Sequence, residues 1–452
     1  MSKKNYLLII ILFVGAFLLL SCKNINEDLK EKLVNLPNDY NHVLTKNLED
    51  ELYLSYLYFE ELTSKTNLTY GLARDRYTNS GLSSIASTGY AILSYVIGVD
   101  NGYISYSEGY EKALKTLQTI KTLNKVEGFM YHFYSMNSGY PSSGSEVSII
   151  DTSLFLVGAL TAAEYFKDEV LALFLEIYDA VNWNFYFDTS VNEYYMGYNP
   201  STKKFSGHWD RYSEQHIIYL LAAGSRTYPS GSLPYSTILN EIVKHKGQFN
   251  QETEEFYLTW GGQLFINQYS NSYIYFDNIV DKKGINWFLN SVTATQANYL
   301  YCQSLNTTYK TFQNNVFGVS ASDGPKGYKA YGSRPCETLK NEIDGTVSPY
   351  SIIGSINYAP ELVISLTDYL ASNPKIFQKY GFISAYNLGL FDDVSETIDG
   401  INYEWYSADF IGIDKGNEMV NLQNYKNALV WRTFMSNKEV QEGLYIMGFK
   451  KI

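Results

Sequence analysis

The sequence contains few cysteine, histidine and proline residues, which limits the chemistry that it can carry. Of its 452 residues, three are Cys, five are His and ten are Pro. Apart from Cys22, only Cys302 and Cys336 remain, so a disulfide framework is excluded, although an oxidising compartment would permit one bridge between them. No HExxH or other ligand spacing relates the histidines, so we expect no metal and no other cofactor. The sequence also lacks a GxSxG elbow and a GxxxxGK[ST] loop.

Positive charge is also scarce, and this argues against a nucleic-acid partner. The chain has 35 Lys and Arg against 47 Asp and Glu, a formal net charge of −12, and no dense basic run. Hydrophobic residues make up 45% and charged residues 18%, which favours a large core over disorder. The 43 Tyr, 24 Phe and 6 Trp are unusually many, and Tyr combines an aromatic face with a hydroxyl group. A neutral ligand with polar rings therefore suits this composition, although most single tyrosines belong to the core or the general surface.

The N-terminus predicts export and lipid attachment. Lys3 and Lys4 precede an apolar run, Tyr6 to Leu20, which is shorter than the roughly 20 residues that span a bilayer. The following Leu19-Leu20-Ser21-Cys22 resembles the lipobox of bacterial lipoproteins. We expect residues 1–21 to be a signal peptide and Cys22 to carry the lipid. The mature chain would be anchored in the bacterial cell envelope, periplasmic or on the outer surface, with an uncleaved anchor as the alternative.

The rest of the chain predicts one helical domain. Residues 22–44 are polar and indicate a tether, and residues 45–452 show no linker and no clean repeat. Residues 71–87 are expected to form a loop and residues 183–207 a β-hairpin inserted between helices. Apolar residues at helical spacing predict helices at 45–65, 84–98, 105–123, 151–166, 170–182, 213–223, 235–246, 285–304, 351–371 and 417–435. This number of helices fits an all-α (α/α)6 toroid with long loops, and we expect a monomer.

The first candidate site lies in residues 128–166, where an aromatic run containing Tyr131 leads through a Gly/Ser loop to Glu146. The segment from Asp151 to Phe166 is apolar nearly all round, which predicts a buried helix with Asp151 or Thr152 as its cap. Glu146 would therefore lie in a loop held by a rigid inner element.

The second candidate site lies in residues 208–225. Ser213 is predicted to cap a helix that holds Glu214 in its first turn and ends at Gly224. Glu214 there could simply complement the helix dipole. A second role is favoured by the residues that precede it, which supply aromatic faces, two charges and a hydroxyl group: Trp209, Asp210, Arg211 and Tyr212.

Two carboxyl groups at helix starts suggest glycosidic cleavage, which needs one acid to protonate the leaving oxygen and one carboxylate to activate water or attack carbon. In a toroid, Glu146 and Glu214 would lie at the same end of the ring. Their separation would decide the outcome, with about 5 Å for retention and roughly 6.5–9.5 Å for inversion. Other loops offer candidate sugar contacts at Gln268, Tyr269, Trp287, Asp323 and Tyr331, in addition to Tyr131.

Several motifs together resemble a known family. They are, in chain order, GLARDR, SSIASTGYAILSYVIGV, GFMYHF, SEVSIIDTSLFLVGAL, HWDRYSE, QYSNSYIYF, GINWFLNS, SASDGPKGYKAYG, DGTVSPYS and ADFIGIDKG. The pattern is similar to the bacterial glucoamylase-like family that contains the β-1,2-glucanases of glycoside hydrolase family 144, and to the hydrolase-like domain of cyclic β-1,2-glucan synthases. The resemblance covers Leu48 to Phe449.

This resemblance implies an (α/α)6 toroid, no metal requirement, and inverting hydrolysis of β-1,2-glucan, either endo or with release of sophorose. It places the two catalytic glutamates at Glu146, as general acid, and Glu214, as general base. The substrate contacts carried over are Trp209, Arg211, Tyr269, Trp287, Asp323 and Tyr331. One departure is Ser143, because related enzymes can have an Asp three residues before the first Glu.

Three alternatives stay open at this point. The chain could be a glycan-binding lipoprotein without activity, or a hydrolase for a different β- or α-glucan. A polysaccharide lyase is a third, since toroids also host Tyr/His elimination chemistry on uronates. An acidic chain is a poor host for a polyanionic substrate, so the lyase is the least favoured.

Overall fold

The computed structural model describes residues 36, 40–245, 254–338, 341–395 and 397–452. The predicted signal peptide and lipidated Cys22 lie outside the described residues, as does most of the predicted tether. The described end of that tether contacts the folded body. The Tyr40 ring meets Trp431 edge to face at 5.9 Å, and His42 stacks on Tyr425 at 4.5 Å.

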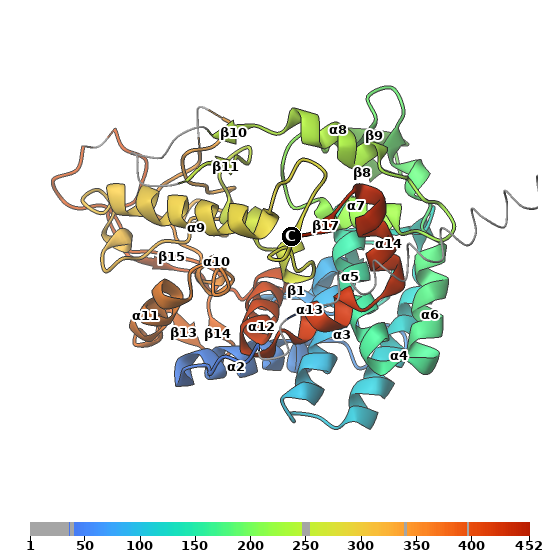
Figure 1. Ribbon diagram of the computed structural model, residues 1–452. Helices are drawn as coiled ribbons and strands as arrows, with labels where there is room; N and C mark the ends of the chain where they lie inside the picture. The colour runs from blue at the N-terminus through green and yellow to red at the C-terminus, as the bar shows by residue number, and fades with distance from the viewer. Residues whose placement is uncertain (1–35, 37–39, 246–253, 339–340, 396) are drawn as a thin grey trace, which may run out of the picture.

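The described chain is rich in helices, as predicted (Figure 1). The α-helices are α2 (Lys46–Leu62), α3 (Ile85–Asp100), α4 (Tyr106–Thr122), α5 (Ile149–Phe166), α6 (Asp168–Asp179), α7 (His216–Ala223), α8 (Leu233–Glu241), α9 (Trp287–Ser304), α10 (Pro349–Ile353), α11 (Pro360–Ala371), α12 (Gly412–Asn427), α13 (Leu429–Met435) and α14 (Lys438–Met447). Short 3-10 turns are η1 (Trp183–Phe185), η3 (Leu264–Asn267), η4 (Ser270–Ser272) and η5 (Lys310–Phe312).

Three helix predictions need correction. The predicted helix 351–371 is two helices, because Pro360 starts a new one and lacks the N–H that a continuous helix requires. The predicted helix 417–435 is also divided, at Ala428, whose φ of 55° is left-handed. The helix α14 was not predicted.

The strands are short, and the predicted loop at 71–87 is wrong. It is instead a hairpin of β1 (Arg74–Arg76) and β2 (Asn79–Ser84), with β5 (Phe133–Ser135) beside β2. The predicted hairpin at 183–207 is confirmed as β8 (Glu193–Asn199) and β9 (Lys204–His208), with β6 (Val147–Ser148) and β7 (Phe187–Asp188) paired to β8. The remaining pairs are β3 (Lys125–Val126) with β4 (Phe129–Met130), β10 (Lys244–His245) with β11 (Phe256–Tyr257), β12 (Ile279–Val280) with β17 (Lys450–Lys451), β13 (Phe377–Gln378) with β14 (Gly381–Phe382), and β15 (Tyr386–Asn387) with β16 (Trp405–Tyr406).

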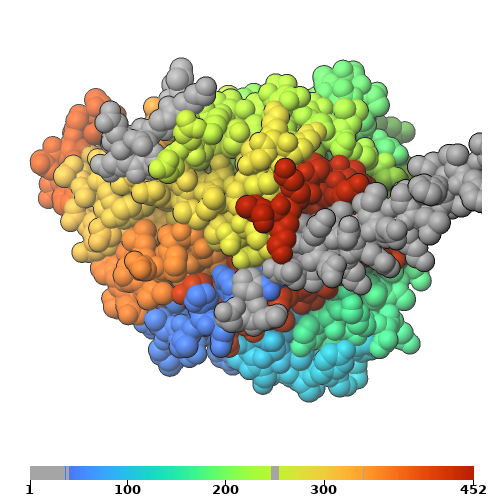
Figure 2. Space-filling model, viewed as in Figure 1, coloured from blue at the N-terminus to red at the C-terminus, as the bar shows by residue number. Residues whose placement is uncertain are grey.

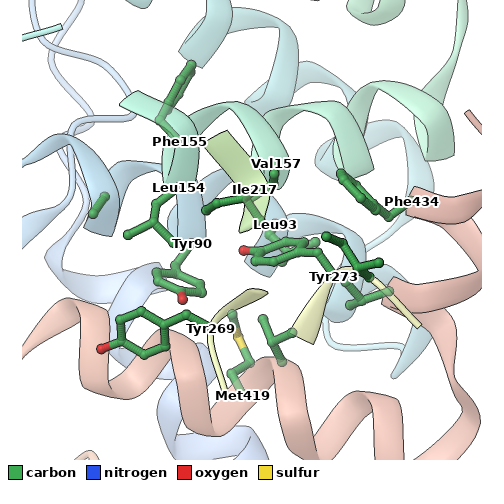
Figure 3. Packing of buried hydrophobic residues seen from close by; sticks show 14 of the residues in the cluster. Tyr90, Leu93, Leu154, Phe155, Val157, Ile217, Tyr269, Tyr273, Met419 and Phe434 are labelled. Carbon is green, nitrogen blue, oxygen red and sulfur yellow. The ribbon is translucent and has the colours of Figure 1, made fainter. Parts of the chain in front are cut away.

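Four inner helices, α3, α5, α7 and α12, are buried along most of their length. The helix α3 packs between α5 and α12, and α5 contacts α7, while α4, α6 and α14 cover α3, α5 and α7 from outside. Figure 3 shows Leu93 of α3, Leu154 of α5 and Met419 of α12 in one apolar cluster. Among the described residues, α5 is the one helix long and apolar enough to cross a membrane, yet it lies inside this core.

A pair of glycines brings α3 and α5 into backbone contact. A Cβ atom added at Gly158 would lie 2.2 Å from the carbonyl oxygen of Gly89, and one at Gly89 would lie 2.5 Å from the Cα of Phe155. No side chain fits between the helices there. This close crossing holds the two inner helices together, and the first turn of α5 lies at the cavity described below.

Elements from the two ends of the described chain meet. The helix α2 contacts α11 and α12, and β12 pairs with the C-terminal strand β17. Figure 2 shows α2, in blue, beside the orange segment that contains α11. The closure of twelve helices into a double ring stays a prediction.

Candidate active site

A cavity of about 730 Å³ opens where three of the inner helices, α5, α7 and α12, begin. Residues just before or within the first turns of α5, α7 and α12 reach it, together with Asp75 and Arg76 of β1. Its charged lining residues are Asp75, Arg76, His132, Glu146, Asp151, Glu214 and Asp414, and its large apolar or aromatic lining residues include Phe133, Leu154, Met196, Trp209, Phe265, Tyr269, Tyr328 and Tyr350. Glu146 and Glu214, which are 68 residues apart in the sequence, therefore line one cavity, as the sequence analysis predicted.

Glu146 precedes β6 on the wall of the cavity. Its carbonyl oxygen accepts a hydrogen bond from the His132 N–H at 2.9 Å, and its side chain is 51% exposed. Across the sheet, Gly197 of β8 leaves room for the carboxylate, because a Cβ atom there would lie 3.0 Å from Glu146 Oε2. The β8–β9 hairpin therefore forms the surface against which the Glu146 side chain rests.

His132 lies between two carboxylates. Its Nδ1 is 3.7 Å from Glu146 Oε1 and 3.7 Å from Asp151 Oδ2. Burial acts against a charge on the ring, but Asp151, Glu146 and Asp75 outweigh it and raise the pKa of His132 to about 9. His132 is therefore an imidazolium ion at neutral pH, and it supplies a positive charge between these carboxylates.

Glu214 occupies the turn before α7, so the prediction that it lies in the first helical turn is wrong. The helix begins at His216, and Ser213 does not cap it: its Oγ donates instead to Glu214 Oε2 at 3.1 Å. The helix ends at Gly224, as predicted. Burial raises the pKa of Glu214 to about 7, with a smaller contribution from the charge of Asp151, against the opposing hydrogen bond from Ser213.

The cap predicted for α5 is also corrected. Ser148 accepts a hydrogen bond from the Asp151 N–H at 3.2 Å and caps the helix, while Thr152 Oγ1 accepts from the Met130 N–H at 2.9 Å. This leaves the carboxylate of Asp151 free to face His132 in the cavity. The sequence could not separate a capping role from a cavity role, because both place an acidic residue in the first turn.

Arg76 of β1 connects this strand to two distant segments at the cavity. Its guanidinium lies 3.2 Å from Asp323 Oδ2 and 3.1 Å from Asp409 Oδ2, and its Nε lies 3.6 Å from Asp75 Oδ2. Asp409 also accepts hydrogen bonds from the N–H and hydroxyl of Thr78, at 2.8 and 2.7 Å. Asp323, a predicted substrate contact, thus orients Arg76 at the edge of the cavity.

Asp414 is a second buried acid in the cavity, on the first turn of α12. Burial raises its pKa well above the usual range, although Ser384 Oγ donates to its Oδ2 at 3.1 Å. Lys415, its neighbour, points elsewhere and pairs with Glu51 and Glu418 at 2.5 Å each. Burial therefore disfavours the ionised form of Asp414.

The predicted sugar contacts divide into two groups. Trp209 and Tyr269 line the cavity. Four others are buried in the core, so the prediction that they contact the substrate directly is wrong. Their side chains form hydrogen bonds within the protein: Tyr212 with Asn267, Gln268 with Ser351, Ser355 and Asn417, Trp287 with Tyr235, and Tyr331 with Asp344. Aromatic and amide side chains suit both a sugar site and a core, so only their burial decides between the two.

The remaining predicted residues lie outside the main cavity. Asp210 and Arg211 are partly exposed and pair with each other at 3.2 Å. Tyr131 lines a separate cavity of about 260 Å³ with Ser142, Ser145 and Asn199. Cys302 and Cys336 are both free thiols, so no bridge joins them.

Sequence reasoning missed several cavity residues. Asp75 and Arg76 lie in the segment predicted as a plain loop, and Tyr328, Tyr350 and Asp414 come from distant segments. Asp75 and Arg76 belong to the motif GLARDR, and the family resemblance of this motif was the one sequence feature that could have marked them as site residues. Asp414 lies in the motif ADFIGIDKG, which also supported the resemblance.

Comparisons with known proteins agree with this architecture. A family model, Glycoamylase ("Putative glucoamylase"), matches residues 206–438. A curated relative, an exo β-1,2-glucooligosaccharide sophorohydrolase (non-reducing end) from Parabacteroides distasonis, is 24% identical over 412 residues, which are 83% of this chain and 54% of the relative. The chain thus spans about half the length of that relative.

Solved structures share the fold. An endo-β-1,2-glucanase from Chitinophaga pinensis, in complex with sophorotriose and glucose, superposes with a TM-score of 0.76 at 23% identity, covering 90% of this chain and 99% of that one. A β-1,2-glucanase from Parabacteroides distasonis gives a TM-score of 0.74 at 21% identity, covering 90% of this chain and 60% of the other. An endo-β-1,2-glucanase from Talaromyces funiculosus, in complex with sophorose, gives 0.58 at 11% identity, covering 89% and 87%.

Proposed function

This chain belongs to the glucoamylase-like family, and on that premise we propose that it is a glycoside hydrolase that cleaves β-1,2-glucan. The observation that carries the proposal is the pair of Glu146 and Glu214 in one cavity with different environments. Glycosidic cleavage needs one carboxyl group that keeps its proton and one that does not. The printed names of the relatives, which are β-1,2-glucan-degrading enzymes, support this substrate.

The environments favour the reverse of the roles implied by the sequence resemblance. Glu214, with a pKa of about 7, keeps a proton in a large fraction of molecules at neutral pH and suits the general acid. Glu146 is half-exposed and 3.7 Å from the His132 cation, which suits a carboxylate that accepts a proton from water. We therefore assign Glu214 as the acid that protonates the leaving oxygen and Glu146 as the base.

In this mechanism, the positive charge of His132 has a positioning role. It holds Glu146 and Asp151 on one side of the cavity without itself transferring a proton. Trp209 and Tyr269 supply apolar faces, and Arg76 donates hydrogen bonds, which together suit the two faces and the hydroxyl groups of a glucose ring.

The inverting outcome and the (α/α)6 ring belong to the same proposal. Inversion requires room for a water molecule between the carboxyl groups, about 6.5–9.5 Å of separation. NMR of the first product formed would show the anomer directly: an α-anomer supports inversion and a β-anomer supports retention. The inner and outer helices and the fold shared with the glucanases support the ring.

The proposal is tested with residues 23–452 and linear β-1,2-glucan. Chromatography of the products should show sophorose alone for exo action or a ladder of oligosaccharides for endo action. Laminarin and mixed-linkage β-1,3-1,4-glucan are the control substrates. Binding of β-1,2-glucan without any product at any pH would replace the hydrolase with a glycan-binding protein on the same fold.

We also propose that the chain is a lipoprotein of the cell envelope, attached through Cys22. The support is the basic, apolar and Leu-Leu-Ser-Cys order of the first residues. The full-length chain should incorporate labelled palmitate and partition with membranes. The Cys22→Ala variant should lose the label, and an unchanged label would place the lipid elsewhere.

A further inference from the structure

Trp260 is the most exposed of the six tryptophans, at 51%, and lies on the loop between β11 and η3. Trp183, Trp287 and Trp431 are fully buried by comparison. Exposed apolar surface carries a free-energy cost in water, so covering this ring would be favourable. Neither the core nor the catalytic cavity accounts for this ring, because it lines neither.

One face of the Trp260 ring is covered by Arg211. The Arg211 guanidinium carbon lies 4.2 Å from the ring centre, a cation–π contact. Arg211 is itself fixed, because its Nη1 lies 3.2 Å from Glu337 Oε2 and its Nε 3.2 Å from Asp210 Oδ1. The exposed area of the indole must then lie largely on its other face and edges.

The backbone under Trp260 is held in place. Its carbonyl oxygen accepts from the Thr338 N–H at 2.9 Å, and the preceding carbonyl, of Thr259, accepts from the Glu337 N–H at 3.0 Å. Gly262 has a φ of 76°, and a Cβ atom there would lie 1.9 Å from the Ser333 carbonyl oxygen. The ring is thus presented on a closely packed loop, which reduces the entropy lost when a ligand binds.

The stacked pair of Trp260 and Arg211 lies close to the catalytic cavity. Arg211 follows Trp209 by two residues and precedes Glu214 by three, and both of these line the cavity. Two residues of extended chain span at most about 7 Å, so the Arg211 backbone lies next to the cavity wall. A polymer that leaves the cavity on this side would pass over Arg211 and Trp260.

We propose that Trp260, backed by Arg211, is a distal subsite that stacks on one sugar unit of a neutral glucan chain, outside the cavity that holds the cleaved bond. This rests on the proposed function. The free indole face, on the side away from Arg211, would contact the apolar C–H face of the sugar ring. Only substrates long enough to extend beyond the cavity would use this subsite.

Trp260→Ala tests the subsite by substrate length. KM for long linear β-1,2-glucan should rise about three- to tenfold with kcat unchanged, the size expected for one aromatic stacking contact. KM for the shortest oligosaccharide that the wild type cleaves should not change. Trp260→Phe should keep most of the affinity for the polymer. Tyr403→Ala, which removes a 56% exposed ring from another loop, is the matched control and should behave as wild type.

A binding measurement separates this inference from the proposed function. In the Glu214→Gln background, long β-1,2-glucan should protect more tryptophan fluorescence from acrylamide quenching than a short oligosaccharide that fills only the cavity, where Trp209 lies, and Trp260→Ala should remove that extra protection. Equal KM changes for short and long substrates, or unchanged KM and no extra protection, would overturn the subsite. If the wild type gives no product, the proposed function fails, and the quenching experiment alone still decides whether Trp260 binds the glucan.

Discussion

Replacing Glu214 with glutamine should stabilise the fold at neutral pH while it removes catalysis. The pKa of Glu214 is raised from its ordinary 4.5 to about 7, mainly because burial removes water from its ionised form. Between these two values the folded state binds more protons than the unfolded state, so stability falls as pH rises from about 4.5 to about 7. Glutamine is neutral at every pH, so the stability of Glu214→Gln should lack this contribution to the pH dependence.

The size of the effect follows from the shift. One pKa unit corresponds to about 1.4 kcal/mol, so a shift from 4.5 to about 7 costs up to about 3 kcal/mol once Glu214 is ionised. This is an upper limit, because the residue keeps partial access to water through the cavity. The free energy of unfolding of Glu214→Gln, relative to wild type, should therefore increase by about 1–3 kcal/mol between pH 4.5 and pH 8.

Urea denaturation of both proteins at the two pH values measures this difference. Subtracting the stability difference at pH 4.5 from the difference at pH 8 cancels effects of the substitution that do not depend on pH, such as an altered hydrogen bond from Ser213. Glu111→Gln on α4, where the side chain is 63% exposed, is the control and should show no such increase. An equal stability difference at both pH values would refute the assignment of a buried, proton-retaining Glu214.

The pH dependence of catalysis tests the same residue. If Glu214 is the general acid, kcat/KM should fall above an apparent pKa of about 7, about tenfold per pH unit. Glu214→Gln should lower kcat by about 10²- to 10⁴-fold, the usual contribution of a general acid. If the residual activity of Glu214→Gln still falls above the same pH, the fall in kcat/KM is caused by the ionisation of another group.

Three further predictions concern positions around the site. His132→Gln should lower kcat because it removes the cation beside Glu146. In the wild type, the stability that this cation adds is complete below about pH 6.5 and should be lost as pH rises through about 9. Thermal melts of both proteins across this pH range measure that loss. Gly197→Ala should lower kcat without unfolding, since its Cβ atom would lie 3.0 Å from Glu146 Oε2. Gly158→Ala should destabilise by about 1–3 kcal/mol or more, because its Cβ atom would lie 2.2 Å from the Gly89 carbonyl oxygen.

A control glycine distinguishes these effects from a general cost of substitution. A Cβ atom at Gly81 would meet only the Asn79 side chain, at 3.7 Å, so Gly81→Ala should leave both kcat and the melting temperature near wild type. A Gly158→Ala protein as stable as Gly81→Ala would contradict the backbone contact between α3 and α5. Full activity of Gly197→Ala would show that Glu146 does not rest against β8.

The sequence by itself predicted most of the helices and placed the two glutamates near helix starts. The apolar pattern from Asp151 to Phe166 predicts a helix buried on most faces, and α5 is such a helix. Glu146 and Glu214 were each predicted at a helix start, and both line the cavity where the inner helices begin. These features depend on local patterns of 10 to 20 residues, which a single sequence records directly.

Only the tertiary structure decided which polar and aromatic residues reach the cavity and how they are charged. Tyr212 and Trp287 have the chemistry of sugar contacts but lie in the core, while Asp414 approaches from the far end of the sequence. The raised pKa of Glu214 depends on protein that surrounds it from several distant segments, and this is why we propose the reverse of the predicted acid and base roles. Burial and the distance between charges are properties of the folded chain, so no local pattern in the sequence encodes them.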